Sequence, residues 1–301
     1  MPVPLAYLGV ILIWSTTPLA IQWSGQEVGF LFGITSRMAI GVLAGLTVAL
    51  VMGIRLPWHA AARLTYLAAG LGLFFAMLSV YWSAQFIPSG WISVLFGIAP
   101  IITGIMATIW LNEQALTPAR IAGMLLGIAG LAGMLLGAQS LGASAPLGIA
   151  GMLFSVTAYS ASAVAIKRIA ADIPALATTI GGLAVTLPLL LAVYYLSGTP
   201  VPHAIPARAA VSIIYLGIIG SVIGFALYYY VLKRVDATRV ALITLITPVM
   251  ALLLGHTLNG EPVQPEVWIS TTAILSGLLL FEYGHRVNGW LGRLLAMITP
   301  E

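Results

Sequence analysis

The chain of 301 residues contains no cysteine, which excludes disulfide bonds and metal sites built from thiolates. Charge is also scarce, because Asp, Glu, Lys and Arg make up 7% of the residues, whereas soluble globular proteins carry roughly a quarter. Hydrophobic residues make up 60%. A chain with so few charges and so many apolar side chains is expected to lie in a membrane rather than in water.

Acidic residues are absent from the middle of every long apolar run. All eight Asp and Glu residues lie at the ends of these runs, between them or near the C-terminus. This placement argues against a relay of buried carboxylates and against a sodium site built from carboxylates. It favours a substrate that is anionic, neutral or aromatic over one that is purely cationic.

Motifs of intramembrane enzymes are absent as well. A rhomboid-like serine protease would contain GxSG and a metalloprotease would contain HExxH, and neither pattern occurs. We therefore expect no enzymatic activity, no cofactor and no metal site. The net charge of +4 does not indicate a nucleic-acid partner, because the basic residues lie at the ends of the apolar runs.

The sequence consists mainly of apolar runs joined by short polar segments. A helix needs about 20 mainly apolar residues to cross the hydrocarbon core of a bilayer. Ten runs meet this requirement, so the sequence predicts an all-α polytopic membrane protein. The predicted spans are residues 4–22, 30–52, 66–86, 91–110, 119–138, 147–166, 175–196, 209–230, 239–257 and 267–283.

The basic residues predict how the chain crosses the membrane. Lys and Arg in short loops are retained on the cytoplasmic side. If the N-terminus is cytoplasmic, ten of the twelve Lys and Arg residues lie on that side, and Arg208 alone lies in an outer loop. We therefore expect both termini in the cytoplasm. The first run lacks a basic n-region and a cleavage site, so it is expected to remain as a span.

The second half of the sequence repeats features of the first. Pro100 and Glu113 are thirteen residues apart, and so are Pro248 and Glu261, at an offset of 148. Proline inside an apolar run and glutamate at its end are both rare, so we predict an internal repeat. The predicted units are residues 1–138 and 146–285, separated by a linker at 139–145 and followed by a cytoplasmic tail at 286–301.

Each predicted unit holds five spans, and an odd number gives the second unit the opposite orientation in the membrane. The fold prediction is therefore ten transmembrane helices arranged as two inverted five-helix repeats. Inverted repeats produce two nearly equivalent shapes, one open to each side of the membrane. The sequence thus predicts a transporter that works by alternating access, with its substrate near the midplane between the halves. A channel is less favoured, because it would not require two inverted halves.

Arg37 is the most informative single residue, because it lies about two turns inside the second span. An unpaired guanidinium there costs about 2.5 to 3.5 kcal/mol on insertion scales. Two interpretations remain open. The side chain either extends to the outer headgroups, or it faces a water-filled cavity and offers its donors to a carboxylate or a phosphate.

Other polar and aromatic residues within spans complete the predicted site. Hydroxyls there can instead repair a helix next to proline, aromatic residues can be packing or interfacial residues, and a membrane histidine is more often neutral than a proton carrier. The predicted substrate-binding residues are Arg37, Trp14, Ser15, Tyr81, Trp82, Gln85, Tyr159, Tyr228, Tyr229 and His256. The predicted hinges are Pro18, Pro100, Pro188 and Pro248.

Glycines in the fifth span are spaced four residues apart, Gly123 with Gly127 and Gly133 with Gly137. Small residues at this spacing let two helices approach closely. The spacing predicts a packing face, either within the monomer or between protomers.

Several of these motifs resemble one family. GIAPIITGIMATIWLNE and LITPVMALLLGHTLNGE resemble the paired EamA-type domains of the drug/metabolite transporter superfamily. WSTTPLAI is similar to the motif of that family's first span, and SRMAIGVL to its second. The second half departs from the pattern, because Gly181 and Gly182 stand where Arg37 has its equivalent, so any site is asymmetric.

The resemblance implies a secondary active transporter of the bacterial inner membrane, commonly an exporter of amino acids or other small metabolites. A lipid or lysophospholipid flippase of the same fold is the alternative, because Arg37 can bind a phosphate as well as a carboxylate. The expected partners are a small-molecule substrate, membrane lipids and, in the case of antiport, protons. Exchange, facilitated diffusion, and a monomeric or homodimeric state remain open.

Overall fold

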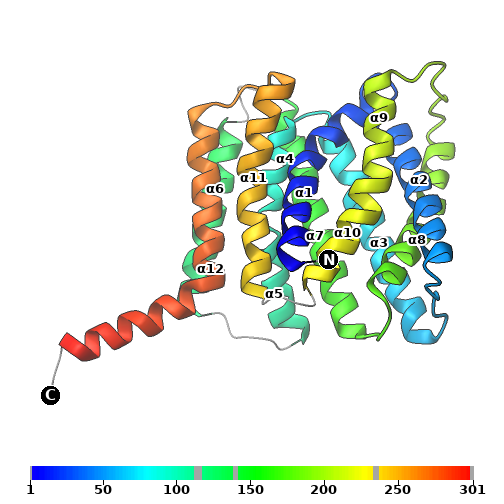
Figure 1. Ribbon diagram of the computed structural model, residues 1–301. Helices are drawn as coiled ribbons and strands as arrows, with labels where there is room; N and C mark the ends of the chain where they lie inside the picture. Colours follow the sequence, from blue (N-terminus) through cyan, green and yellow to red (C-terminus); the bar gives the residue numbers. More distant parts are fainter. Residues whose placement is uncertain (1, 112–116, 138–141, 233–236, 299–301) are drawn as a thin grey trace.

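The computed structural model describes residues 2–111, 117–137, 142–232 and 237–298 (Figure 1). Within these residues all regular secondary structure is helical. The helices are α1 Val3–Gly25, α2 Phe30–Val51, α3 Ala60–Ser83, α4 Ser89–Phe96, α5 Ala99–Leu111, α6 Pro118–Gly137, α7 Ala145–Ile169, α8 Ala175–Leu196, α9 Ala207–Tyr215, the π-helical segment η2 Leu216–Ile223, α10 Gly224–Leu232, α11 Ala237–Asn259 and α12 Pro265–Ile298.

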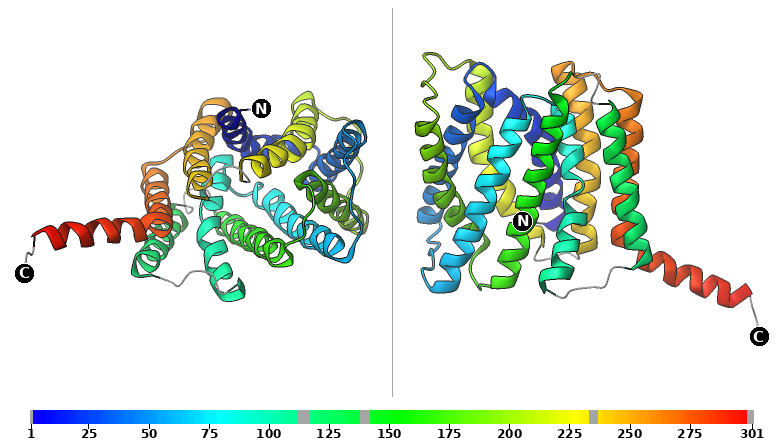
Figure 2. Two further views of the ribbon diagram at one scale, coloured as in Figure 1. Left: turned by 60° about the horizontal axis from the view of Figure 1, so that its bottom comes forward. Right: turned by 180° about the vertical axis from the view of Figure 1, so that it is seen from behind.

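Eight stretches of the described chain are long and apolar enough to cross a membrane. Two shorter apolar stretches, Ile246–Asn259 of α11 and Pro265–Phe281 of α12, lie beside them in the bundle (Figure 1). The predicted class, an all-α polytopic membrane protein, is confirmed, whereas the count of ten spans stays a prediction. Helix α12 continues past the predicted span end at residue 283, and its last part extends away from the bundle (Figure 2).

Proline and glycine set many of the helix ends. Pro118 and Pro265 are the first residues of α6 and α12, where the missing backbone N–H would have no intrahelical partner. Gly53, Gly198 and Gly260 follow α2, α8 and α11, and all three adopt positive φ angles. A left-handed residue after a helix lets the chain turn back, and glycine does so without Cβ strain.

The fourth predicted span is broken near its middle. Helix α4 ends at Phe96, and α5 begins at Ala99, one residue before Pro100. Because Pro100 has no backbone N–H, it cannot donate to the carbonyl of Phe96, and the helical ladder is interrupted there. Pro248, its predicted repeat partner, lies inside the continuous helix α11, so the break is present in one half only.

The eighth predicted span contains the π-helical segment η2 between α9 and α10. Single π turns inside α-helices occur mostly at functional sites. Gly217 of this segment packs closely on α2, because a Cβ added to it would lie 3.0 Å from the carbonyl oxygen of Arg37. The sequence did not predict this segment, since an apolar run has the same composition in α and π geometry.

Helix packing follows a pattern that relates the two halves. Helix α3 packs on α7 and α8, while the stretch α9–η2–α10 packs on α1 and α2. Counted from the first helix of each half, α1 corresponds to α7, α2 to α8, and α3 to α9–η2–α10. Exchanging the two halves therefore turns the contacts of α3 with α7 and α8 into the contacts of α9–η2–α10 with α1 and α2. The pairs α2 with α8, α4 with α11, and α6 with α12 each join corresponding helices. Such a pattern is that of a pseudo-two-fold axis between the halves.

Glycines of α6 and α12 face each other where these two helices pack together. A Cβ on Gly123 would lie 2.5 Å from the carbonyl oxygen of Gly277, and a Cβ on Gly277 would lie 2.6 Å from that of Gly123. Gly127 also contacts this face, because its backbone N would lie 2.7 Å from the Cβ on Gly277. The glycine spacing of the fifth span therefore serves packing within the chain.

Replacing Gly277 with alanine is expected to separate α6 from α12 and to lower the stability of the protein by about 1 to 3 kcal/mol, as overpacking does in other cores. Thermal unfolding in detergent measures the change. The control is Thr272→Ala, an exposed position of the same helix whose hydroxyl donates only to the Trp268 carbonyl of its own helix. A Gly277→Ala protein that unfolds at the wild-type temperature would show that the helices have room to adjust.

Candidate functional site

A cavity of about 490 Å³ lies inside the bundle and is lined by residues of both halves. This volume is in the range of small-molecule sites. Its lining includes Arg37 and Ser93 near the beginnings of α2 and α4, and Thr108 near the end of α5. It also includes Arg120 in the first turn of α6 and Lys167 in the last turn of α7. The lining thus extends from the middle of the bundle to the helix ends at the bottom of Figure 1.

Arg37 lies at the inner part of this cavity and is 3% exposed. Its Nε donates a hydrogen bond to Ser221 Oγ at 3.2 Å, whereas its Nη1 has no hydrogen-bond partner among the described residues. The guanidinium carbon lies 6.0 Å from the centre of the Tyr81 ring. Among the described residues no carboxylate forms a salt bridge with it. The side chain therefore points into the protein, and its charge is available for an anionic ligand.

The π-helical segment η2 forms the surface opposite Arg37. Ser221 of this segment accepts the hydrogen bond from Nε, and Gly220 lines the cavity next to it. A Cβ on Gly220 would lie 3.7 Å from the Arg37 Nη2 atom. The absence of a larger side chain at residue 220 leaves room beside the guanidinium.

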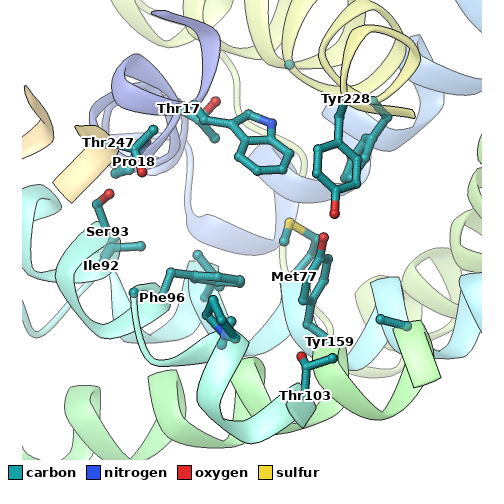
Figure 3. Close-up of a pocket in the computed structure, with 18 of the residues that line it drawn as sticks. Thr17, Pro18, Met77, Ile92, Ser93, Phe96, Thr103, Tyr159, Tyr228 and Thr247 are labelled. Atoms are coloured by element: carbon teal, nitrogen blue, oxygen red, sulfur yellow. The ribbon is translucent and has the colours of Figure 1, made fainter. Parts of the chain in front are cut away.

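Five aromatic residues of the described chain line the cavity, and the four other than Phe225 form two packed pairs. Trp14 of α1 packs against Tyr228 of α10 with ring centres 4.9 Å apart, and Phe96 of α4 packs against Tyr159 of α7 with ring centres 5.7 Å apart. Figure 3 shows Phe96, Tyr159 and Tyr228 directed into the same space. We call Trp14, Phe96, Tyr159 and Tyr228 the aromatic quartet. Its rings offer apolar faces to a bound molecule.

The comparisons with known proteins agree with this architecture. The model of the EamA-like transporter family matches residues 2–136 and again residues 146–283. The chain belongs to the EamA-like transporter family. It is thus a multi-helix membrane transporter, as the sequence predicted.

The relatives of this EamA-like transporter include several named as transporters. A protein of Streptantibioticus cattleyicolor called a probable terminal-alkyne amino-acid exporter is 24% identical over 96% of this chain and 97% of its own length. An uncharacterized transporter of Archaeoglobus fulgidus is 23% identical over 90% of this chain and 95% of its own. The uncharacterized inner membrane transporter YedA of Escherichia coli K12 is 25% identical over 66% of this chain and 64% of its own length. One crystal structure shares the fold, with a TM-score of 0.64, 23% identity, and coverage of 93% of this chain and 96% of the other.

The EamA-like transporter brings some of the predicted site residues together. Arg37, Trp14, Tyr159 and Tyr228 all line the cavity, as do the predicted hinges Pro18 and Pro100 (Figure 3). Further lining residues were not in the predicted set, because the sequence does not show which hydroxyl and aromatic residues of an apolar span face the cavity. They include Thr17, Met77, Ser93, Phe96, Thr103 and Thr247.

Two predicted residues lie behind the cavity lining. Tyr81 is buried beside Arg37, and its hydroxyl accepts a hydrogen bond from Ser24 Oγ at 3.2 Å. Ser15 is buried with its hydroxyl unpartnered among the described residues. Neither contributes to the cavity surface. The side chain of Tyr229 lies outside the described residues.

Other predicted residues lie away from the cavity. The Trp82 ring packs against Phe86, and Gln85 is exposed and donates to the backbone of its own turn. Pro188 of α8 is exposed on the outside of the bundle. Pro248 is buried but is not part of the lining. These positions give no support for a direct role in substrate binding.

His256 lies near the end of α11 and is largely exposed. Its Nδ1 is 3.0 Å from the backbone oxygen of Glu261, a hydrogen bond that fits a structural role. We expect His256→Gln to leave the pH dependence of transport unchanged, because the ring lies outside the cavity lining. Uptake by proteoliposomes at a series of pH values measures this. A flattened pH profile would instead identify His256 as a proton carrier.

Glu261 joins three helices at the end of the bundle opposite Arg120 and Lys167, and it is 8% exposed. One carboxylate oxygen accepts from Asn259 Nδ2 at 2.9 Å, and the other accepts from the backbone N–H of Gly90 at 3.3 Å. Asn259 also accepts from Trp23 Nε1 at 2.9 Å and donates to Gln22 at 3.0 Å. We call these contacts the Glu261 network. They connect the C-terminal end of α1, the N-terminal end of α4 and the loop after α11.

The Glu261 network was not predicted from the sequence. The position of Glu261 at a span end was recognised, but a terminal glutamate is ordinarily solvated, so its burial was unexpected. Its location at the N-terminus of α4 is favourable for a carboxylate, because the first backbone N–H groups of a helix lack partners and carry partial positive charge. Arg208, the basic residue predicted to lie outside, stacks on Trp23 of the same network at 5.1 Å.

Proposed function

We propose that this protein exports small carboxylate-bearing metabolites, amino acids among them, across the inner membrane by alternating access. The observation that carries the proposal is the buried Arg37 guanidinium, whose Nη1 lacks a partner and which lines a cavity of small-molecule size. An unpaired buried charge is unfavourable unless a ligand neutralises it. A carboxylate can receive two parallel hydrogen bonds from the planar guanidinium, which makes it a fitting ligand.

The direction of loading is inferred from the charges at the two ends of the bundle. The cavity lining extends to Arg120 and Lys167, and basic residues are retained on the cytoplasmic side. This supports a form that is accessible from the cytoplasm, with both termini on that side. The Glu261 network connects α1, α4 and α11 at the opposite end, where it closes the outer entrance.

The alternation between two forms is inferred from the two halves. The exchange of helix contacts between corresponding helices supports an inverted pair of five-helix units. Inverted units have two equivalent shapes, so the contacts that close one end in this form have counterparts that close the other. The interruption between α4 and α5 provides a place where one half can bend.

The name of the Streptantibioticus cattleyicolor relative supports an amino acid or a related acid as substrate, because that protein is called a probable amino-acid exporter. At 24% identity the substrate need not be shared. The features that bear on this chain's own substrate are Arg37 and the aromatic quartet.

The experiment is uptake by purified protein in proteoliposomes. A mixture of labelled amino acids and small organic acids is expected to give saturable uptake that unlabelled substrate competes. Uptake of a headgroup-labelled phospholipid or lysophospholipid in place of these acids would favour a flippase. Imposing a pH gradient in the same vesicles tests whether protons drive transport.

A further inference from the structure

The charged side chains of the cavity are all of one sign within the described residues. Arg37, Arg120 and Lys167 belong to the lining, and no described Asp or Glu does. An amino acid bound with its carboxylate on Arg37 would bring its ammonium group into this cavity as well. Removing an ammonium group from water is unfavourable unless a carboxylate or several acceptors replace its hydration.

Neutral acceptors are present but provide little compensation for an ammonium. The hydroxyls of Ser93 and Thr247 line the cavity, and each can accept a hydrogen bond without supplying a negative charge. Thr17 and Thr103 also line it; their hydroxyl protons are donated to the Ile13 carbonyl and to Ser160 Oγ at 2.7 and 3.0 Å, which leaves their oxygens as further neutral acceptors. Among the described residues, the site therefore has cationic partners for a carboxylate and only uncharged acceptors for an ammonium.

The aromatic quartet provides the second half of the recognition. Aromatic faces bind both apolar groups and, through cation–π attraction, positive charges. Here a cation would lie in a cavity whose described charged side chains, Arg37, Arg120 and Lys167, are all positive, and it would be repelled. Ile21, Met77 and Val80 add further apolar surface to the lining. An uncharged apolar body is thus the better occupant for the space between the rings.

We propose that this site recognises the carboxylate and the apolar body of its substrate and not an amine, so that the preferred substrate class is the apolar monocarboxylates. This inference rests on the proposed transport function and narrows it. In this form the carboxylate binds Arg37 and the body lies among Trp14, Phe96, Tyr159 and Tyr228. An α-ammonium group weakens binding, because it is desolvated without receiving a counter-charge.

Three ligands with the same phenyl body test the proposal: 3-phenylpropionate, L-phenylalanine and 2-phenylethylamine. Binding to the purified protein is measured by calorimetry in detergent. Uptake into vesicles is not used here, because the uncharged, protonated forms of these weak acids cross lipid bilayers unaided. We expect 3-phenylpropionate to bind at least about tenfold more tightly than phenylalanine, and 2-phenylethylamine not to bind. Arg37→Ala is expected to abolish binding of 3-phenylpropionate. Phe96→Ala is expected to weaken the binding of 3-phenylpropionate by about tenfold while leaving the binding of the smaller acid propionate unchanged.

The outcomes separate this inference from the proposed function. Tighter binding of phenylalanine than of 3-phenylpropionate overturns the inference and leaves an amino-acid exporter standing. Tightest binding of 2-phenylethylamine overturns both. If neither 3-phenylpropionate nor hexanoate binds, the inference is also overturned, and saturable uptake of other acids in proteoliposomes decides whether the proposed function survives.

Discussion

Replacing Arg37 with alanine is expected to reduce the uptake of a carboxylate substrate by about two to four orders of magnitude. The estimate follows from the loss of about 3 to 5 kcal/mol when one partner of a buried ion pair is removed. In the free protein the guanidinium has one hydrogen bond to Ser221 and no described counter-charge. The variant should therefore fold at least as stably as the wild type, since it no longer buries an uncompensated charge.

Two further variants make the Arg37 result specific. Arg37→Lys keeps the charge but loses the planar pair of donors, so we expect weak residual uptake. Arg63→Ala removes an exposed arginine of α3 and is expected to transport like the wild type. Normal uptake by a correctly folded Arg37→Ala protein would show that the cavity binds its substrate without the guanidinium.

Replacing Glu261 with alanine is expected to open the end of the bundle that the Glu261 network closes. Two hydrogen bonds to a buried carboxylate are lost, and the N–H of Gly90 loses its side-chain acceptor. Hydrogen bonds to charged groups contribute about 1.5 to 3 kcal/mol each, so losing two disfavours the closed form by about two to four orders of magnitude. A single cysteine at Thr247, which lines the cavity, should then react correspondingly faster with a membrane-impermeant thiol reagent added outside.

The matched control for this experiment is Glu266→Ala, which removes an exposed glutamate at the beginning of α12. It is expected to leave the labelling rate of the cysteine at residue 247 unchanged. Because the chain contains no natural cysteine, each engineered thiol is the only one that reacts. An equal labelling rate in the Glu261→Ala protein would show that the network does not hold the outer end closed.

Much of the fold was accessible from the sequence, because apolar runs of span length and the scarcity of charge leave few alternatives. The helix boundaries were less accurate: α3 begins at Ala60, six residues before the predicted span. Residues 60–65 include Arg63 and Thr65, whose polarity ended the apolar run although the helix continues through them. The π-helical segment η2 could not be predicted, because an apolar run has the same composition in α and π geometry.

The site was predictable only where a residue type is rare in a membrane. Arg37 was identified because its burial requires a compensating environment. Trp14 and Tyr159 stand at the starts of WSTTPLAI and YSASAVAI, which correspond in the two halves at an offset of 145. Trp82 and Gln85 were predicted from residue type alone, and their orientation depends on helix phase. Adjacent residues such as Tyr81 and Trp82 point about 100° apart on a helix, so one faces Arg37 and the other faces Phe86.

The most direct measurement of alternating access uses a single cysteine at Ser93, which lines the same cavity as Arg37. Impermeant thiol reagents are added to inside-out vesicles in one experiment and to intact cells in the other. If one pocket is presented to each compartment in turn, the thiol reacts from both sides, and a bound carboxylate substrate protects it from both. Reaction from one side only, with or without substrate, would contradict a pocket shared by two inverted halves.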